Sequence, residues 1–180
     1  MASIGHVAMG LTAARWLHPP QRSGAQLLGS MVFWSGLSLA PDLDVVGFYF
    51  GVNYGDAWGH RGATHSLAFA LGVAILAFAW RSWLPAARSF SVSARKLALV
   101  AFLVTASHGL LDTLTDGGLG CALLWPFNNE RLFAPWNPIP VSPLGLRFLS
   151  SRGLSVALVE LALFSPFFLY ALLPRRKRRQ

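Results

Sequence analysis

The segment HGLLD has the clearest metal-binding spacing in the chain. His108 and Asp112 are four residues apart, so on a helix their side chains lie on one face, about one turn apart. An imidazole and a carboxylate placed in this way can bind one metal ion together, or one can bind while the other bridges to a second ion. Asp116 would continue this face, but Gly117 and Gly118 predict that the helix ends there.

Three further stretches contain histidine or aspartate. The segment APDLD carries Asp42 and Asp44, whose side chains would point the same way if the chain is extended after its proline. The segment HRGATHS carries His60, expected on a loop, and His65, expected just inside the next helix, while His6 lies near the start of the chain. A single such residue is usually a helix cap or a solvated side chain. The hypothesis of a site therefore depends on all four stretches meeting.

The donor types indicate which ion such a site would hold. Imidazoles and carboxylates without thiolates suit zinc, with manganese and related divalent ions as alternatives. Carboxylates that can bridge suit a centre with two metal ions, which stabilises the attacking and leaving oxygens of a phosphoester displacement. The chain has no HExxH, GxSxG or Walker segment. We therefore expect one or two divalent ions.

The elements that must position these residues are apolar enough for a membrane. Of 180 residues, 54% are hydrophobic and 12% are charged, about half the charged share of a soluble domain. The net charge is +8, but the basic residues cluster at the ends of apolar runs, which indicates membrane topology and not nucleic acid binding. We expect an all-α, polytopic transmembrane helix bundle with about four spans and a short N-terminal helix.

The expected spans follow the apolar runs. These runs cover residues 24–40, 63–80, 97–111 and 154–173, and a weaker helical stretch covers 4–17. A spanning helix needs about 20 apolar residues; the last run reaches this length and the others fall slightly short. We expect the weaker stretch to pack on the bundle.

Basic residues in the connections predict the orientation. The connections near 15–22 and 81–96, with the tail, hold eleven basic residues on one side, against four on the other side. The positive-inside rule then places the tail, 175–180, in the cytoplasm. The His/Asp motifs and a Pro-rich loop, 113–153, face outward from the inner membrane, and residues 1–174 form one membrane-embedded domain.

Three other charged residues are candidates for support or substrate binding. Glu160 lies about two turns into the last run, where an acid is costly. It either supports the site or pairs with Arg147 or Arg152. Arg61 and Arg131 would hold a substrate phosphate, or they contact lipid at the membrane interface.

Five segments in order along the chain resemble the YdjM-type membrane-bound metal-dependent hydrolases of bacteria and archaea. They are HVAMG, LAPDLD, HRGATHS, HGLLDTLT and LLWPF. The stretch FAPWNPIPVSPLG resembles a subset of that family, and the resemblance covers about residues 5–165. The combination of HRGATHS and HGLLD at this separation is its most specific part. The family is in turn similar to zinc phospholipase C and P1 nuclease, which are all-helical phosphodiesterases with a zinc cluster.

This resemblance implies particular ligands. They are His6, Asp42 or Asp44, His65, His108 and Asp112, with Asp112 bridging two ions and His6 serving the second ion. The soluble relatives use an N-terminal Trp as a ligand, whereas this chain begins with Met1. The histidines of their third metal have no counterpart after Asp112. The resemblance therefore implies two ions or one.

The expected reaction is hydrolysis of a phosphoester, with a lipid headgroup that reaches the site laterally as the leading substrate class and a small molecule as the alternative. His60 would act as an acid/base or would orient a ligand, and Asp44 belongs to the same catalytic pair. Rival hypotheses are cleavage of an amide or ester bond and a membrane protein that binds metal without catalysis. Membrane lipid is the expected partner, nucleic acid is not, and the oligomeric state stays open.

Overall fold

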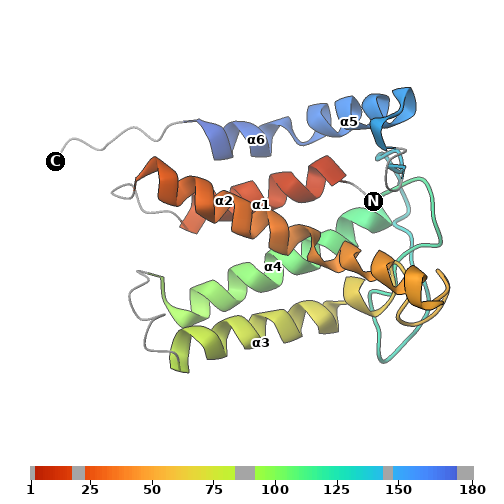
Figure 1. Cartoon of the computed structure of the whole chain (residues 1–180), viewed down its shortest axis with the longest axis horizontal. Coiled ribbons are helices and arrows are strands. Elements are labelled where there is room, and N and C mark those ends of the chain that lie inside the picture. The colour runs from red at the N-terminus through yellow and green to blue at the C-terminus, as the bar shows by residue number, and fades with distance from the viewer. Residues whose placement is uncertain (1–2, 18–22, 84–91, 144–147, 174–180) are drawn as a thin grey trace.

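The chain forms a bundle of helices that run along one axis (Figure 1). The computed structural model describes residues 3–17, 23–83, 92–143 and 148–173. The helices, with η for 3-10 helices, are α1 (Ser3–Leu17), α2 (Gly24–Leu39), η1 (Ala40–Phe50), η2 (Ala63–His65), α3 (Leu67–Trp83), α4 (Ala94–Thr113), α5 (Ser151–Leu163) and α6 (Ser165–Leu172). In the described ranges β-structure is limited to two isolated bridges, Thr115 with Ile139 and Cys121 with Leu132. The all-α prediction is confirmed.

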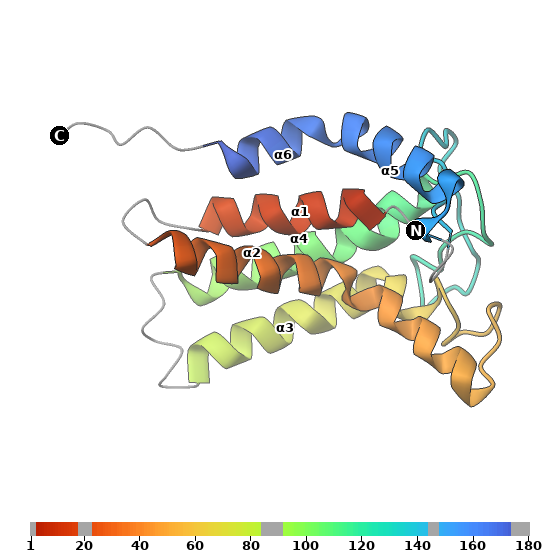
Figure 2. The ribbon, with the colours of Figure 1, turned by 45° about the horizontal axis from the view of Figure 1, so that its top comes forward.

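The helices form two antiparallel pairs with a bent helix alongside. Helix α1 packs mainly on α2, and α3 packs mainly on α4. Helices α5 and α6 lie against α1, so α1 is enclosed by its neighbours (Figures 1 and 2). Gly10 permits the close α1–α2 approach, because a Cβ atom there would lie 2.4 Å from the Cα of Ser35. The stretch expected to pack on the bundle is thus one of its inner helices.

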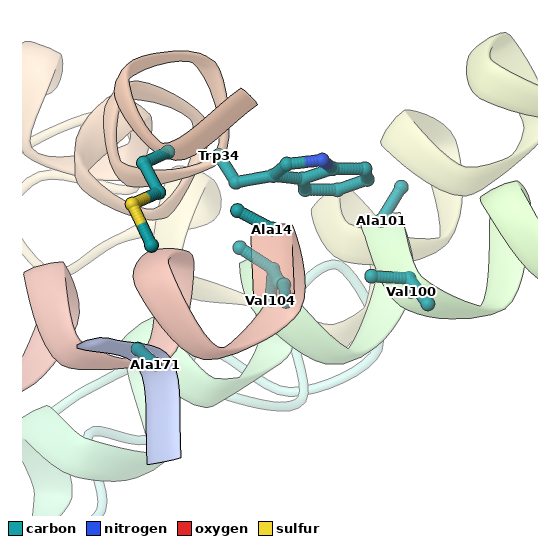
Figure 3. Close-up of a cluster of buried hydrophobic side chains, with 8 residues drawn as sticks. Ala14, Trp34, Val100, Ala101, Val104 and Ala171 are labelled. Atoms are coloured by element: carbon teal, nitrogen blue, oxygen red, sulfur yellow. The ribbon is translucent and has the colours of Figure 1, made fainter. Parts of the chain in front are cut away.

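Small side chains and one indole form the centre of the bundle. Trp34 of α2 is 4% exposed and lies over Val100 and Ala101 of α4, with Ala14 of α1 beside them (Figure 3). Alanines on α1 and α4 let these helices approach the indole closely. Burial of the apolar surface of one such aromatic ring contributes on the order of 2 kcal/mol to folding.

The two ends of the bundle differ in construction. At one end, here called the hairpin end, lie Leu17, Gly24, Trp83 and Ala94, where the paired helices begin or finish (Figure 1). At the other end, here called the loop end, lie the start of α1, both 3-10 helices, the end of α4 and the segment 114–143 (Figures 1 and 2).

Backbone hydrogen bonds attach the segment 114–143 to the loop end. Ala122 N donates to the carbonyl of Arg61 at 2.9 Å, and Leu67 N donates to the carbonyl of Leu123 at 3.0 Å. Asn137 Nδ2 donates to the carbonyl of Thr113 at 2.8 Å. The Pro-rich segment is therefore an ordered cover over the end of α4 and the start of α3.

The span lengths differ from the sequence expectation. Within the described residues, α4 (Ala94–Thr113) is long and apolar enough to cross a membrane, and α5 with α6 qualifies only as a pair bent by 67°. Helix α3 is apolar but shorter, at 17 residues. The prediction of about four spans is not confirmed by length and composition. The basic tail, 175–180, and Arg147 lie outside the described residues.

The segment after α2 is helical, so the extended conformation in which Asp42 and Asp44 would point the same way is not adopted. Pro41 stands at the start of the 3-10 helix η1, where a proline is tolerated because the first N–H groups of a helix have no intrahelical partner. The long helix expected to contain His65 begins after that residue. His65 closes the short turn η2, and α3 starts at Leu67.

Candidate metal centre

Five of the predicted ligand residues meet at the loop end. They are His6 of α1, Asp42 of η1, His65 of η2, and His108 and Asp112 of α4. Their exposed fractions run from 0% to 8%. The residues come from four separate elements, so the convergence expected from the sequence is present in the structure.

Four donor atoms face a common point. The Nε2 atoms of His65 and His108 are 3.1 Å apart, and His108 Nε2 lies 3.3 Å from Asp42 Oδ1. His65 Nε2 lies 3.5 Å from Asp42 Oδ1 and 3.8 Å from Asp112 Oδ2. Ligand atoms around a tetrahedral zinc ion with bonds of about 2.0 Å are separated by about 3.3 Å. Four of the six separations therefore lie near this value, and all four donor atoms lie within 4.8 Å of one another, so the group could hold a metal ion.

The remaining nitrogen of each imidazole is already bonded. His108 Nδ1 lies 2.6 Å from the carbonyl oxygen of Ser38 at the end of α2, so it donates there. His65 Nδ1 lies 3.2 Å from Asp44 Oδ2. A proton on each Nδ1 leaves the Nε2 lone pair for a cation, which is the usual outer support of a metal-binding histidine.

The carboxylate of Asp42 is buried and has no hydrogen bond within the described part of the chain, as expected for a metal ligand when no cation is bound. Both of its carboxylate oxygens are buried, and among the described residues no donor meets hydrogen-bond geometry with either of them. Burial raises the pKa of Asp42, but the imidazoles of His108 and His65 lower this pKa well below its usual range. A buried anionic carboxylate without hydrogen bonds is costly, and a bound cation would remove that cost.

Asp44 plays a different structural part from Asp42. It accepts hydrogen bonds from His60 Nδ1 at 2.7 Å, from Thr64 Oγ1 at 2.7 Å and from the backbone N–H of Arg61 at 3.2 Å. Burial raises the pKa of Asp44, but the hydrogen bonds from His60 and His65 lower it to about 2. The cluster of Asp44, His60 and His65 could itself hold an ion. Its carboxylate is already satisfied, however, so the set that contains Asp42 fits a metal better.

Asp112 connects the cluster to two further side chains. Its Oδ1 lies 3.3 Å from His6 Nε2, and its Oδ2 lies 3.0 Å from Arg61 Nε. The His6 ring also stacks on His108, with ring centroids 3.7 Å apart. His6 therefore lies beside the four-donor set and against the second oxygen of Asp112.

The charges of the buried groups favour a divalent cation. The cluster contains three carboxylates, those of Asp42, Asp44 and Asp112, and one guanidinium, that of Arg61, which contacts Asp112; all four side chains are at most 8% exposed. With neutral imidazoles the cluster carries a net charge of −2. Burial lowers the pKa of His65, but the carboxylates of Asp42 and Asp44 outweigh it and raise that pKa. This raised pKa shows the local preference for positive charge.

Comparison with known proteins identifies the family. A sequence model described as YdjM inner membrane protein matches residues 1–177. The chain belongs to the YdjM family. The YdjM resemblance found in the motifs is thereby confirmed, whereas the likeness to phospholipase C stays a prediction.

A curated relative of this YdjM protein has a similar length. The chain is 41% identical over 142 residues to the inner membrane protein YbcI of Escherichia coli strain K12, covering 77% of this chain and 79% of YbcI. No solved structure matches the chain. Localisation to the inner membrane is therefore supported by family and relative.

The two arginines predicted to hold a phosphate contact the protein itself. Arg61 donates to the carbonyl of Gly117 at 2.7 Å and to Thr115 Oγ1 at 2.9 Å, besides its contact with Asp112. Arg131 donates to the carbonyls of His60 and Tyr54, at 2.9 and 3.0 Å. Both side chains thus stabilise the loops around the centre, and their phosphate-binding role stays a prediction.

Glu160 supports α1 rather than joining the donor set. Its Oε2 accepts hydrogen bonds from the backbone N–H groups of Ile4 at 2.7 Å and Gly5 at 3.0 Å. These groups belong to the first turn of α1, where N–H groups lack helical partners and a negative charge is favourable. Arg152, one of the expected partners, is exposed. Glu160 therefore fixes the start of the helix that carries His6.

Several supporting groups were not predicted from the sequence. They are the carbonyl of Ser38, which holds His108, and the hydroxyls of Thr64 and Thr115, which contact Asp44 and Arg61. Gly109 brings α4 against the turn η2, because a Cβ atom there would lie 2.1 Å from the carbonyl oxygen of His65. The glycine in HGLLD was a detectable signal for this close approach, since a glycine inside a helix lowers its stability and needs a packing reason.

Proposed function

We propose that this YdjM family protein is a multi-pass metal-dependent hydrolase of the inner membrane, acting on a phosphoester in a lipid headgroup. The observation that carries the proposal is the convergence of four buried donor atoms within 4.8 Å of one another, with the outer nitrogen of both the His65 and the His108 ring already in contact with an oxygen. Such an arrangement is typical of catalytic and structural metal sites alike. Membership of a family of inner membrane proteins favours a lipid substrate reached from the side.

Four membrane passes fit the outer surfaces of the helices. Large apolar side chains point outward on α2, α3, α4 and α5, such as Val32 at 67%, Ile75 at 59%, Leu103 at 47% and Leu158 at 58% exposure. A water-facing surface rarely carries contiguous patches of this kind. In this arrangement α2, α3, α4 and the bent α5–α6 pair cross the membrane, and α1 is enclosed. The positive-inside rule then orients the loop end toward the periplasm.

The donor set assigns the metal ligands. Asp42, His65, His108 and Asp112 would hold one ion, and His6 with Oδ1 of Asp112 would contribute to a second ion. A bound divalent metal lowers the pKa of a coordinated water and stabilises charge on phosphoryl oxygens. The chain's own residues fix the imidazole orientations and exclude bulk water, since every member of the set is buried.

His60 and Asp44 form the catalytic pair of this proposal. Asp44 accepts the hydrogen bond from His60 Nδ1, which orients the other ring nitrogen to accept or donate a proton. The same carboxylate orients His65, so it links the proton-transferring residue to the metal-binding one. Arg61 acts through Asp112. For Arg61 or Arg131 to contact a phosphate directly, its guanidinium would have to give up its present hydrogen bonds to backbone carbonyls.

Metal content tests the site. The detergent-purified protein should contain a divalent metal by elemental analysis, and His108→Ala should lose it because one donor of the set is gone. Asp116→Asn is the control, since Asp116 Oδ1 accepts a hydrogen bond from Val141 N outside the donor set. Absence of metal from the wild-type protein would overturn the proposal.

A substrate panel tests the reaction. Phosphodiester, phosphomonoester, carboxylic ester and amide compounds should be compared with the metal-loaded protein and with His60→Ala. Hydrolysis of phosphoesters alone, lost in the variant, would support the proposal. Cleavage of only esters or amides would favour the alternative metalloenzyme, and no cleavage by a metal-loaded protein would favour a non-enzymatic metal site.

A further inference from the structure

A groove separates α2 from α3 in the half of the bundle nearer the hairpin end. Its volume is about 890 Å³. Helices α2 and α3 both pack on α4, but in the described residues they do not pack on each other. Phe33 and Leu37 of α2, with Leu76 and Trp80 of α3, form the walls, and Ala101 of α4 lies at its base.

The length of the groove matches one leaflet of a bilayer. Along α2 its lining runs from Gln26 to Leu37, which is about 16 Å at 1.5 Å per residue. One leaflet contributes about 15 Å of a hydrocarbon core of about 30 Å. An extended apolar space of this length fits one acyl chain.

The polar groups of the groove lie toward its hairpin end. Gln26 stands near the start of α2 and Arg81 near the end of α3, and both belong to the lining. Two other indoles mark this level, since Trp16 is 44% and Trp83 is 79% exposed, and tryptophans concentrate at membrane interfaces. Arg81 is therefore placed at the height of lipid phosphates.

The groove is separate from the donor set but connected to it through α2. Within the described parts of the chain, the groove lining includes none of the candidate ligands. Leu37, at the inner end of the groove, directly precedes Ser38, whose carbonyl holds His108. An occupant of the groove would thus support the helix that orients one ligand.

We propose that this groove binds one acyl chain of an anionic phospholipid, with the lipid phosphate at Arg81. The occupant comes from the leaflet at the hairpin end and is a bound lipid distinct from the substrate of the metal centre. An apolar wall selects the chain, and the positive charge at the mouth selects the anionic headgroup. The inference goes beyond the hydrolase proposal and does not depend on it.

Native mass spectrometry of the delipidated full-length protein tests the inference. The protein is titrated with phosphatidylglycerol and, separately, with phosphatidylethanolamine. We expect one phosphatidylglycerol to bind about tenfold more tightly than phosphatidylethanolamine, because the ammonium group of phosphatidylethanolamine offsets the phosphate charge that Arg81 would meet. Equal retention of the two lipids would overturn the assignment of the headgroup.

Two glycines provide matched variants for the apolar part. Gly29 lines the groove, and Gly72 lies on α3 outside the lining; a Cβ atom at either position meets nothing within 4 Å. Gly29→Phe should place a ring in the groove and reduce phosphatidylglycerol binding at least about tenfold. Gly72→Phe should leave binding unchanged. Equal binding by both variants would overturn the groove as the site.

Arg81 variants test the charge. Arg81→Gln should abolish the preference for phosphatidylglycerol, whereas Arg81→Lys should retain it because the positive charge remains. Retention of the preference in Arg81→Gln would overturn the role of Arg81. Metal content, measured in the same samples, keeps this outcome distinguishable from failure of the hydrolase proposal.

Discussion

The two ring nitrogens of His65 contact different acids, and this separates Asp42 from Asp44. Nε2 faces Asp42 and the other donors, whereas Nδ1 faces Asp44. The sequence predicted that Asp42 or Asp44 is a metal ligand but did not distinguish between them, because both side chains would point the same way if APDLD were extended. In the 3-10 helix η1, with three residues per turn, residues two positions apart do not point the same way. No periodicity in five residues reveals that difference.

Asparagine variants of these two residues should therefore behave differently. Asp42→Asn removes a ligand charge, so most of the metal should be lost on dialysis. Asp44→Asn leaves the four donors in place and weakens the support of His65 and His60, so the metal should stay bound with an affinity about 10- to 100-fold lower. Elemental analysis and competition with a chelator measure both effects. Equal metal loss in the two variants would contradict the assignment.

His60 and His65 provide a second comparison at this scale. His65→Ala should lose metal and activity together, since Nε2 is a donor. His60→Ala should keep most of the metal but lose rate, because His60 contacts the set through Asp44 and lies 3.9 Å from Asp42. The measurement is metal content beside hydrolysis rate. A His60→Ala protein as metal-poor as His65→Ala would place His60 among the ligands.

Among the helices, α1 depends on an acid from α5. Glu160→Leu should remove two hydrogen bonds to a charged group and lower the free energy of unfolding by about 3 kcal/mol. Glu160→Gln should lower it less, since an amide oxygen still accepts hydrogen bonds. Thermal unfolding followed by circular dichroism measures the change, with exposed Ser155→Ala on α5 as the control. Unchanged stability of Glu160→Leu would show that this cap does not hold α1.

Gly109 tests the contact between α4 and η2. Gly109→Ala should stabilise an isolated helix by about 1 kcal/mol, yet here its Cβ atom would collide with the carbonyl of His65. We expect reduced metal affinity and reduced stability, whereas helix propensity alone would predict increased stability. Gly72→Ala, which has open space, should show the propensity effect alone. A metal-replete Gly109→Ala protein would show that the turn can move away.

The positions of the helices were easier to predict from the sequence than their ends. Apolar runs predicted α2 and α4 to within a few residues, because apolar length is a strong signal. The 67° break between α5 and α6 was missed, although Pro166 stands at the start of α6. An extended stretch was considered after Pro41, but this proline stands at the start of a 3-10 helix. A proline marks a boundary but does not determine whether the next segment is helical or extended.

For the whole molecule, the expectation that the His/Asp motifs meet at one end is confirmed by the positions of the described helices. Hydropathy and loop charge predicted this arrangement because helices joined by short connections must alternate in direction. The supporting contacts of Ser38, Thr64 and Thr115 could not be predicted, because each depends on tertiary packing between distant segments.

Thiol labelling tests the orientation. Asn129→Cys, in the exposed part of the 114–143 segment, should react with a membrane-impermeant reagent in intact cells, and Gln180→Cys should not. The native Cys121 should give little background, because it is buried and burial raises its pKa to about 12, which keeps it a thiol. The reverse labelling pattern would place the metal centre on the cytoplasmic side.

The contact between Glu160 and Gly5 also affects the order in which the chain can fold during synthesis. These residues are 155 positions apart, so a ribosome that adds about 5 to 20 residues per second makes the cap roughly 8 to 30 s after the helix it holds. During that interval His6 belongs to an unfixed first turn, and Asp112 is synthesised before the cap exists. A chain arrested before α5 should therefore insert its earlier helices but bind metal weakly.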